Sequence, residues 1–182
     1  MAQDAPNTVF LAGDEAGLYL QATTCYVWSP IGQTPIVRAD PGRAKTNFYG
    51  ALNLHTGQEV AMRSDLMNAE ISAQYLEMIL KTNPDVAIIL FWDRAPWHRG
   101  KPIDQVLEDN PRLEIIFFPT ASPDLNPQEH VWKAVRKGVS HNHLEARLPE
   151  LADRFLKQLN STTFKSSFLD RYGYTTICPM FN

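Results

Sequence analysis

The stretch Val86–Trp92 (VAIILFW) is apolar at all of its positions and is followed at once by Asp93. A strand buried on both faces has this composition, which is typical of central parallel strands in α/β sheets. Asn68 is a suitable N-cap for a helix before this strand, and residues 101–109 predict a helix after it. A further strand is expected over residues 113–118. Two successive β–α connections indicate an α/β domain with right-handed crossovers.

The part of the chain before this pattern is rich in short β-type stretches. Gly13-Asp14-Glu15 predicts a turn after the first of them, and Thr56-Gly57 predicts a hairpin turn. The strands predicted here cover residues 8–12, 18–23, 26–28, 47–54 and 59–63. They indicate an antiparallel meander. Joined to the parallel strands, it predicts a mixed sheet flanked by helices.

Length and composition limit the class of protein. The chain has 182 residues, of which 44% are hydrophobic, so we expect one globular domain over residues 1–182 rather than a disordered chain. The tail over residues 161–182 gives no clear prediction. The apolar run is too short to span a bilayer, and the polar start Met1–Asn7 does not resemble a signal peptide. Cys25 and Cys178 lie far apart, which favours a reduced cytoplasmic chain without structural zinc.

The charge balance is slightly acidic. There are 17 Lys and Arg residues against 20 Asp and Glu residues, a formal net charge of −3. This argues against a protein that binds nucleic acid through bulk charge alone. A local basic groove remains compatible with it.

Three carboxylates stand out by their positions. Asp14 follows the first predicted strand, Asp93 follows the apolar strand, and Glu129 lies in the first turn of a helix that Asn126-Pro127 opens. Side chains at the carboxyl ends of neighbouring strands, about 4.8 Å apart, converge on one crevice. Carboxylates are the ligands that Mg²⁺ and Mn²⁺ prefer. Two such ions, roughly 3.5–4 Å apart, would activate water and stabilise the leaving oxygen in phosphodiester hydrolysis.

Each acid also has an ordinary structural interpretation. Asp14 suits a turn after Gly13, and Asp93 suits a cap for the loop after its strand. Glu129 lies three residues after Asn126, the spacing of a capping box. The spacing alone leaves both interpretations open.

The sequence around these acids resembles the three catalytic blocks of DDE transposases. The blocks are Gly13–Glu15 (GDE), Trp92–His98 (WDRAPWH) and Ser122–Trp132 (SPDLNPQEHVW). The third block is highly specific, and the blocks occur in the order and at the spacing of the mariner superfamily, in particular its bacterial insertion-sequence branch. The stretch Val27–Pro35 also resembles this branch. The resemblance covers about residues 8–160.

The resemblance implies an RNase H-like fold, with a mixed five-stranded sheet flanked by helices. It also implies that Asp14, Asp93 and Glu129 are the metal-binding triad. The reaction it implies is cleavage of DNA at transposon ends, dependent on Mg²⁺ or Mn²⁺ with two ions bound, followed by strand transfer into target DNA. It further implies a homodimer that acts on DNA, without a membrane, in the bacterial cytoplasm at the nucleoid. Glu15 is usual in the first block but is not a triad member.

Two features depart from the family. Arg94 replaces the usual Asn after the second Asp, where an Arg could contact a phosphate or disturb the site. Full-length members also have an N-terminal helix-turn-helix region, whereas this chain begins almost at the first catalytic strand. We expect that region to be encoded in a separate frame or subunit, or to be lost.

Other residues are candidates for DNA contact. Lys133 and Arg136 share a helical face with Glu129 and could form a phosphate-binding ridge, or simply a solvated face. His98 could tune the metal shell, touch a phosphate or make a loop hydrogen bond. Trp28 could stack on a base, although a buried aromatic is the more common outcome.

Two other functions fit the same residues. A free-standing RNase H-like nuclease or resolvase would use the same acids without strand transfer. A catalytically idle transposase fragment would act through protein interaction.

Overall fold

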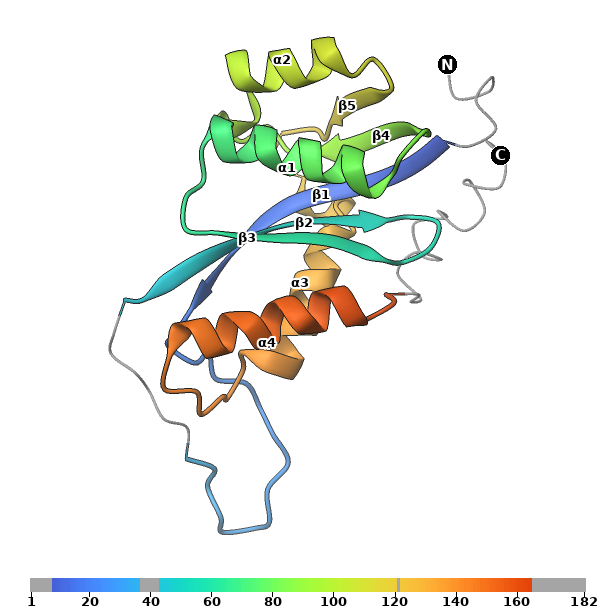
Figure 1. The fold of residues 1–182 in the computed structure, drawn as a ribbon. Helices are drawn as coiled ribbons and strands as arrows, with labels where there is room; N and C mark the ends of the chain where they lie inside the picture. The colour runs from blue at the N-terminus through green and yellow to red at the C-terminus, as the bar shows by residue number, and fades with distance from the viewer. Residues whose placement is uncertain (1–7, 37–42, 121, 165–182) are drawn as a thin grey trace.

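The computed structural model describes residues 8–36, 43–120 and 122–164, and its centre is a five-stranded sheet (Figure 1). The strand order is β3-β2-β1-β4-β5. The strands are β1 (Thr8–Tyr19), β2 (Lys45–Asn53), β3 (Glu59–Ser64), β4 (Ala87–Trp92) and β5 (Leu113–Phe117). β1, β2 and β3 form an antiparallel meander, whereas β1, β4 and β5 are parallel. The predicted mixed sheet is therefore confirmed.

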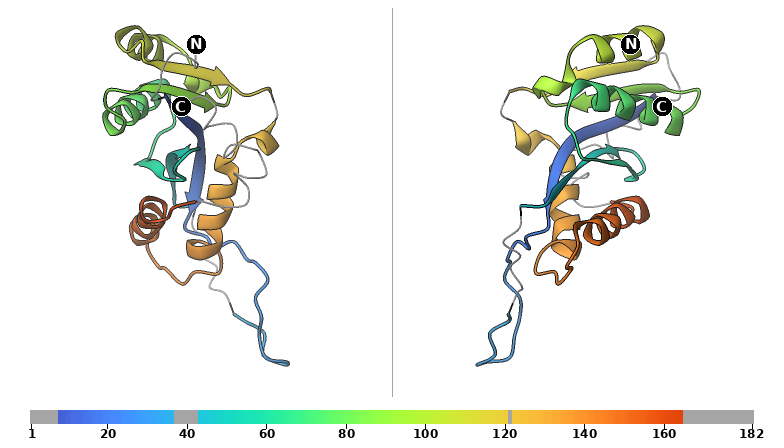
Figure 2. Two further views of the ribbon diagram at one scale, coloured as in Figure 1. Left: turned by 90° about the vertical axis from the view of Figure 1, so that its right-hand side faces the viewer. Right: turned by 60° about the vertical axis from the view of Figure 1, so that its left-hand side comes forward.

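Helices cover both faces of this sheet (Figure 2). The helices are α1 (Ala69–Thr82), α2 (Lys101–Asp109), α3 (Gln128–Val139) and α4 (Leu148–Ser161). α1 and α2 pack on one face, over a core that includes Leu90 and Trp92. α3 and α4 pack on the other, over a core that includes Ala12 and Leu52. The arrangement is the expected α/β architecture.

Local signals explain where α1 begins and ends. The Asn68 side chain accepts a hydrogen bond of 2.9 Å from the Ile71 backbone N–H, which satisfies one of the free donors of the first turn. At the other end the Asn83 backbone N–H donates to Ile79. The prediction that Asn68 caps this helix is confirmed.

The predicted turn at Gly13-Asp14-Glu15 is wrong, because β1 runs through it without a break. Residues 11–19 of β1 all pair with β2, and Asp14 lies opposite Gly50. Pairing with β2 satisfies the backbone along this whole length, so no turn is needed. A glycine at position 13 serves close packing instead, because a Cβ there would lie 3.1 Å from Leu90 Cδ1 and 3.3 Å from Trp92 Cδ1.

Three other predictions need correction. β4 is not fully buried on both faces, because its residues alternate between buried and partly exposed. Residues 26–28 form no strand and lie in an exposed loop. α3 begins at Gln128, one residue later than expected: Pro127 is the capping position, and Asn126 Oδ1 accepts from the Gln128 backbone N–H at 3.1 Å.

Some predictions fall on the ends of the chain. Met1–Asn7, Cys178 and the tail beyond residue 164 lie outside the described residues, so those predictions stay untested. Within the described part, α4 ends at Ser161 and Phe164 is buried. In that part of the chain no helix combines the length and the apolar character that crossing a membrane requires.

Candidate active site

Asp14 lies in the middle of β1 rather than at its end. Successive side chains of a strand point to opposite faces, so Asp14 faces α3 and its neighbour Glu15 faces α1. Trp132, on α3, donates from Nε1 to Asp14 Oδ2 at 3.1 Å. This hydrogen bond fixes one oxygen of the carboxylate.

Asp93 comes directly after β4, at the level of Asp14. The last residue pair between β1 and β4 is Ala12 with Phe91, two residues before each acid. Both acids therefore share the face that carries Ala12 and Phe91. The Ala95 backbone N–H donates to Asp93 Oδ1 at 2.9 Å, so the acid also caps the loop after its strand, as its structural interpretation predicts.

Glu129 occupies the first turn of α3. The expected capping box does not form, because the Asn126 backbone N–H donates to the Pro123 carbonyl oxygen instead. Asn126 is buried, and its Nδ2 donates to the Gly13 carbonyl oxygen at 3.1 Å. This hydrogen bond ties the start of α3 to β1 beside Asp14.

The three acids line one open cavity of about 340 Å³. The same cavity is lined by Arg94, Ala95, Phe118, Pro119, Thr120, Ser122, Pro123 and Asn126. The sequence blocks thus come together in space: β1 supplies Asp14, the end of β4 supplies Asp93, and the start of α3 supplies Glu129.

The electrostatics of this cavity favour a bound cation. Burial raises the pKa of Asp14 to about 7, and the neighbouring charges of Glu15, Glu129 and Asp93 act in the same direction. The raised pKa shows that the negative charges of these carboxylates repel one another, and a bound divalent cation would relieve that repulsion. Carboxylates are also the ligands that Mg²⁺ and Mn²⁺ prefer.

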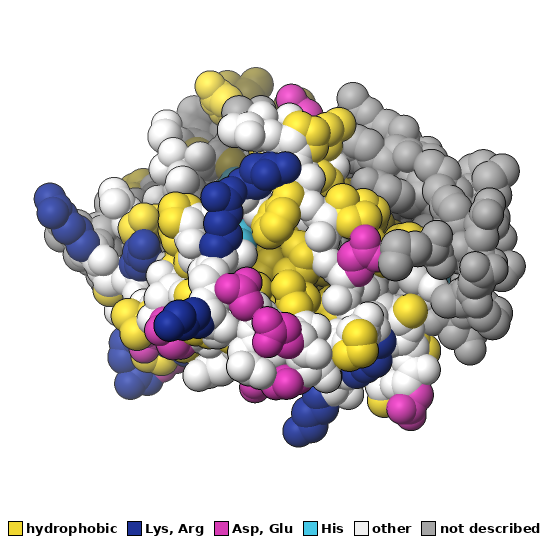
Figure 3. Space-filling view, turned by 90° about the horizontal axis from the view of Figure 1, so that it is seen from above, with side chains coloured by type: hydrophobic (Ala, Val, Ile, Leu, Met, Phe, Trp, Pro, Cys, Tyr) yellow, Lys and Arg dark blue, Asp and Glu magenta, His cyan; other side chains and the backbone are white. Residues whose placement is uncertain are grey.

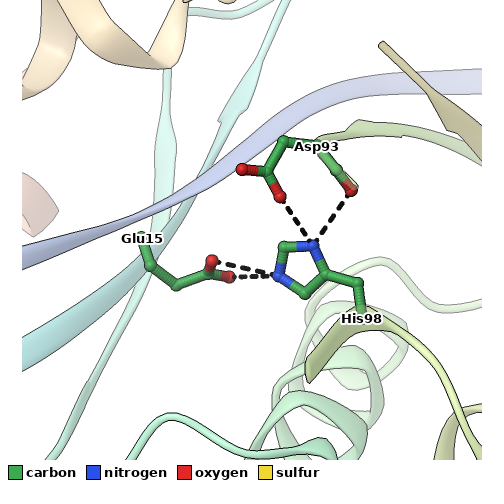
Figure 4. Close-up of side chains that lie close together, drawn as sticks. All are labelled: Glu15, Asp93 and His98. Atoms are coloured by element: carbon green, nitrogen blue, oxygen red, sulfur yellow. Dashed lines mark hydrogen bonds and ion pairs between the residues drawn. The ribbon is translucent and has the colours of Figure 1, made fainter. Parts of the chain in front are cut away.

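A second group, Glu15, Asp93 and His98 (Figure 4), shares Asp93 with the cavity. His98 Nδ1 lies 2.8 Å from Asp93 Oδ1, and Nε2 lies 2.9 Å from Glu15 Oε1. Trp92 and Trp97 also donate to Glu15 from their Nε1 atoms, at 3.2 and 3.0 Å. One potential metal-ligand atom from each of these three residues lies within 4.8 Å of the other two, which among the described residues makes them a possible metal-binding group.

His98 acts in this group as a positive charge between two acids. Burial lowers its pKa, but the hydrogen bonds to Asp93 and Glu15 outweigh that effect and raise the pKa to about 9. The bond from His98 is also the main reason why the pKa of Asp93 is lowered. Because both ring nitrogens are engaged, His98 takes the place that a cation would otherwise fill.

The candidate DNA-contact residues lie in different settings. The His98 side chain is fully buried, which favours contact with the acids over contact with a phosphate. Trp28 is fully exposed, so the expectation of a buried aromatic is wrong. Lys133 is exposed on α3, while Arg136 is half-buried and donates to the Gly17 carbonyl oxygen at 3.2 Å. Arg94 is exposed at the cavity, and its Nε donates to the Phe118 carbonyl oxygen.

Seen from above, the described part of the molecule shows no broad basic face. Figure 3 shows Lys and Arg side chains dispersed among acidic and hydrophobic ones. This agrees with the net charge of −3. Positive charge at the acidic cavity therefore comes from single side chains such as Arg94.

Several residues that build the site escaped the sequence analysis. A Cβ at Gly50 would lie 2.5 Å from both Gln128 Nε2 and Trp132 Cη2, so only glycine lets α3 approach the sheet this closely. The ring of Trp132 is buried, and its hydrogen bond to Asp14 was not foreseen. The signals present were a glycine inside a strand and a tryptophan within the third block.

The fold and its acidic cavity define an RNase H-like endonuclease domain. Residues 9–152 match the family described as DDE superfamily endonuclease, and the chain belongs to that family. The family expected from the three sequence blocks is therefore confirmed.

Two curated proteins are similar in sequence to this chain. The chain is 25% identical over 134 residues to the insertion element IS630 uncharacterized 39 kDa protein of Shigella sonnei, covering 71% of this chain and 38% of that protein. It is 26% identical over 98 residues to the uncharacterized protein y4pE/y4sA of Sinorhizobium fredii (strain NBRC 101917 / NGR234), covering 53% of this chain and 70% of that protein. The chain thus spans little more than a third of the length of the insertion-element protein.

Solved structures of Mos1 transposase have the same fold. The paired-end complex with the left transposon end matches with a TM-score of 0.64 at 16% identity, covering 95% of this chain and 53% of that one. The catalytic domain of Mos1 mariner transposase matches with a TM-score of 0.58 at 13% identity, covering 94% and 78%. Mos1 paired-end complexes were solved with Mn and with Mg.

Proposed function

We propose that this domain catalyses divalent-metal-dependent DNA strand cleavage and strand transfer in DNA transposition. The observation that carries the proposal is the convergence of Asp14, Asp93 and Glu129 on one cavity. Family membership and the likeness to transposase structures support it. An RNase H-like nuclease without strand transfer and an idle fragment are the alternatives that the experiment below separates.

In the proposed reaction, Asp14, Asp93 and Glu129 hold Mg²⁺ or Mn²⁺, with two ions when DNA is bound. The ions would supply activation of the attacking oxygen and stabilisation of the leaving oxygen. The protein's own contribution is orientation. Trp132 holds Asp14 Oδ2, and His98 and the Ala95 N–H hold Asp93 Oδ1. Metal ligands that are held by such partners need little rearrangement on binding.

We also propose that DNA enters along the cavity rim past Arg94. Its guanidinium is exposed there and suits a phosphate, while Lys133 and Arg136 extend the path along α3. A DNA substrate on the chromosome implies that the protein works at the nucleoid. The helix-turn-helix region that recognises transposon ends would be supplied by another part or subunit of the complete protein.

A homodimer is part of the proposal. The loop over residues 20–36 extends away from the rest of the fold (Figure 1), and Tyr26, Trp28, Ile31 and Ile36 are almost fully exposed on it. Exposed apolar groups of this size mark association surfaces, and a second copy of this chain is the partner we propose. Trp28→Ala with Ile31→Ala should convert a dimer to a monomer in light scattering. An unchanged dimer would place the interface elsewhere.

The test of the reaction uses single acid-to-amide variants. Asp93→Asn and Glu129→Gln should each abolish Mn²⁺-dependent cleavage and strand transfer with cognate DNA ends, while circular dichroism shows an intact fold. Glu108→Gln, which removes an exposed charge on α2, serves as the matched control and should remain active. Wild-type cleavage of either variant would refute the triad. Cleavage without strand transfer would favour the nuclease alternative, and inactivity of the wild type would favour the idle fragment.

A further inference from the structure

Glu59 is a partly exposed residue whose Oε2 atom is buried, and the proposed reaction does not use it. It lies on the edge strand β3, on the same sheet face as Asp14, and its carboxyl group meets the first residue of α3. Gln128 Nε2 donates to Glu59 Oε1 at 2.6 Å, and the Gln128 side chain is fully buried. The two residues therefore join an edge strand to the helix that carries Glu129.

Two buried atoms of this pair have no hydrogen-bond partner among the residues that the structure describes. They are Glu59 Oε2 and Gln128 Oε1, and both can only accept hydrogen bonds if Glu59 is ionised. A buried acceptor without a donor destabilises the fold, and it does so more when it is charged. An ionised Glu59 would thus leave two buried acceptors of one hydrogen-bonded pair without a donor.

One proton on Glu59 Oε2 removes both problems. The neutral acid would donate from Oε2 to Gln128 Oε1 while Oε1 continues to accept from Gln128 Nε2. The surroundings favour this form: burial raises the pKa of Glu59 well above its usual value, the bond from Gln128 opposes that effect, and the charge of Asp14 adds to it. In the described part of the chain, no Lys, Arg or His forms an ion pair with Glu59 that would favour the charged form.

We propose that Glu59 is held as a neutral carboxylic acid whose two hydrogen bonds with Gln128 position the first turn of α3, and with it Glu129. Glu59 is a positioning residue, because it reaches the cavity only through Gln128. The part that concerns Glu129 rests on the proposed function, whereas the protonation of Glu59 does not.

The packing around the pair explains why it controls position. Gln128 immediately precedes Glu129, and Trp132 lies one helical turn further on the same side. Both side chains sit over Gly50, where a Cβ would also clash with Glu59 Oε1. Gly50 therefore sets how close α3 comes, and the Glu59–Gln128 pair sets where along the sheet its first turn lies.

The first test is spectroscopic and needs no activity. An infrared difference spectrum of wild type minus Glu59→Gln, recorded at neutral pH without metal, should show the carbonyl band of a protonated carboxyl group. Both proteins should also carry Asp14→Asn, because the charges of Glu59 and Asp14 influence each other and Asp14 could otherwise contribute to the band. If the difference shows only a carboxylate band, Glu59 is ionised and the proposal fails.

The second test measures cleavage as a function of Mn²⁺ concentration. Glu59→Gln can form the same two bonds with Gln128, so it should stay within about twofold of wild type. Glu59→Leu cannot form them and should raise the half-maximal Mn²⁺ concentration at least tenfold, the usual effect of losing a partner behind a metal ligand. A loss in Glu59→Gln as large as in Glu59→Leu would show that the carboxylate charge is used, and would overturn the proposal.

A partner exchange keeps the test valid if Glu59→Leu fails to fold. Gln128→Glu places two acids together and should weaken both Mn²⁺-induced thermal stabilisation and cleavage. The double variant Glu59→Gln/Gln128→Glu restores one acid and one amide, and should recover most of the loss. If the double variant recovers neither the Mn²⁺-induced stabilisation nor the cleavage, the proposed pairing of Glu59 with Gln128 is refuted. A wild type without cleavage would refute the proposed function while leaving the infrared result standing.

Discussion

Replacing Asp14 by Asn should make the metal-free protein more stable at alkaline pH. The pKa of Asp14 rises from 3.8 to about 7 on folding, mainly through burial. An acid with a raised pKa binds more protons in the folded state, so its contribution to stability falls as pH rises from about 4 to 7. At 1.36 kcal/mol for each pH unit, the cost of ionising Asp14 at pH 8 is about 4 kcal/mol as an upper value.

Asn removes this cost and keeps the useful contact, because its side-chain oxygen can still accept from Trp132 Nε1. For a chain of this length, 1 kcal/mol shifts the melting temperature by about 2–4 °C. We therefore expect Asp14→Asn to melt up to about 16 °C above wild type at pH 8 in EDTA. Below pH 4 the two proteins should melt together. Mn²⁺ should stabilise wild type and leave Asp14→Asn unchanged.

Thermal unfolding followed by circular dichroism at pH 4, 6 and 8 is a sufficient assay. Asp93→Asn is a control of opposite sign, since the bond from His98 lowers the pKa of Asp93 and the charged form is the favoured one. That variant should be less stable than wild type at pH 8. The reasoning fails if Asp14→Asn gains nothing at pH 8, or gains the same amount at pH 4.

Three further predictions concern residues around the cavity. Gly50→Ala should cost about 1–3 kcal/mol in urea unfolding, because its Cβ would overlap Gln128 and Trp132; an unchanged midpoint would contradict this. His98→Asn should lose about 3 kcal/mol below pH 6.5, and the loss should shrink as pH rises towards 9, because the pKa of His98 is about 9 in the folded protein. Arg94→Ala should weaken DNA binding and reduce its salt slope by about one, and an unchanged slope would exclude a phosphate contact.

Much of the fold follows from local signals in the sequence. The apolar run of β4 predicts a central parallel strand, and Asn68 predicts the start of α1, because each depends on a few neighbouring residues. The turn predicted at Gly13 failed because a glycine can serve close packing as well as chain reversal. Only the position of Trp92 on the adjacent strand distinguishes the two.

The candidate site likewise has residues that the sequence identifies and residues that only the tertiary structure shows. Asp14, Asp93 and Glu129 were identified through motif blocks, and the fold brings them to one cavity. Glu59 could not be identified, since its contact with Gln128 joins residues 69 positions apart and depends on how α3 lies on the sheet. The burial of Glu15 likewise depends on three donors that arrive from β4 and the loop after it.

The unbroken course of β1 has a consequence for which length changes the domain can tolerate. Asp14 and Glu15 are neighbours that serve opposite faces of the sheet, one towards Trp132 and the other towards His98. Deleting one residue earlier in the strand would turn each acid to the wrong face of the sheet. A deletion in the loop over residues 20–36 leaves the register of strand pairing unchanged. A deletion scan across residues 8–36 should therefore show an abrupt boundary near the end of β1. Before that point every single deletion is inactivating, and after it most are accepted.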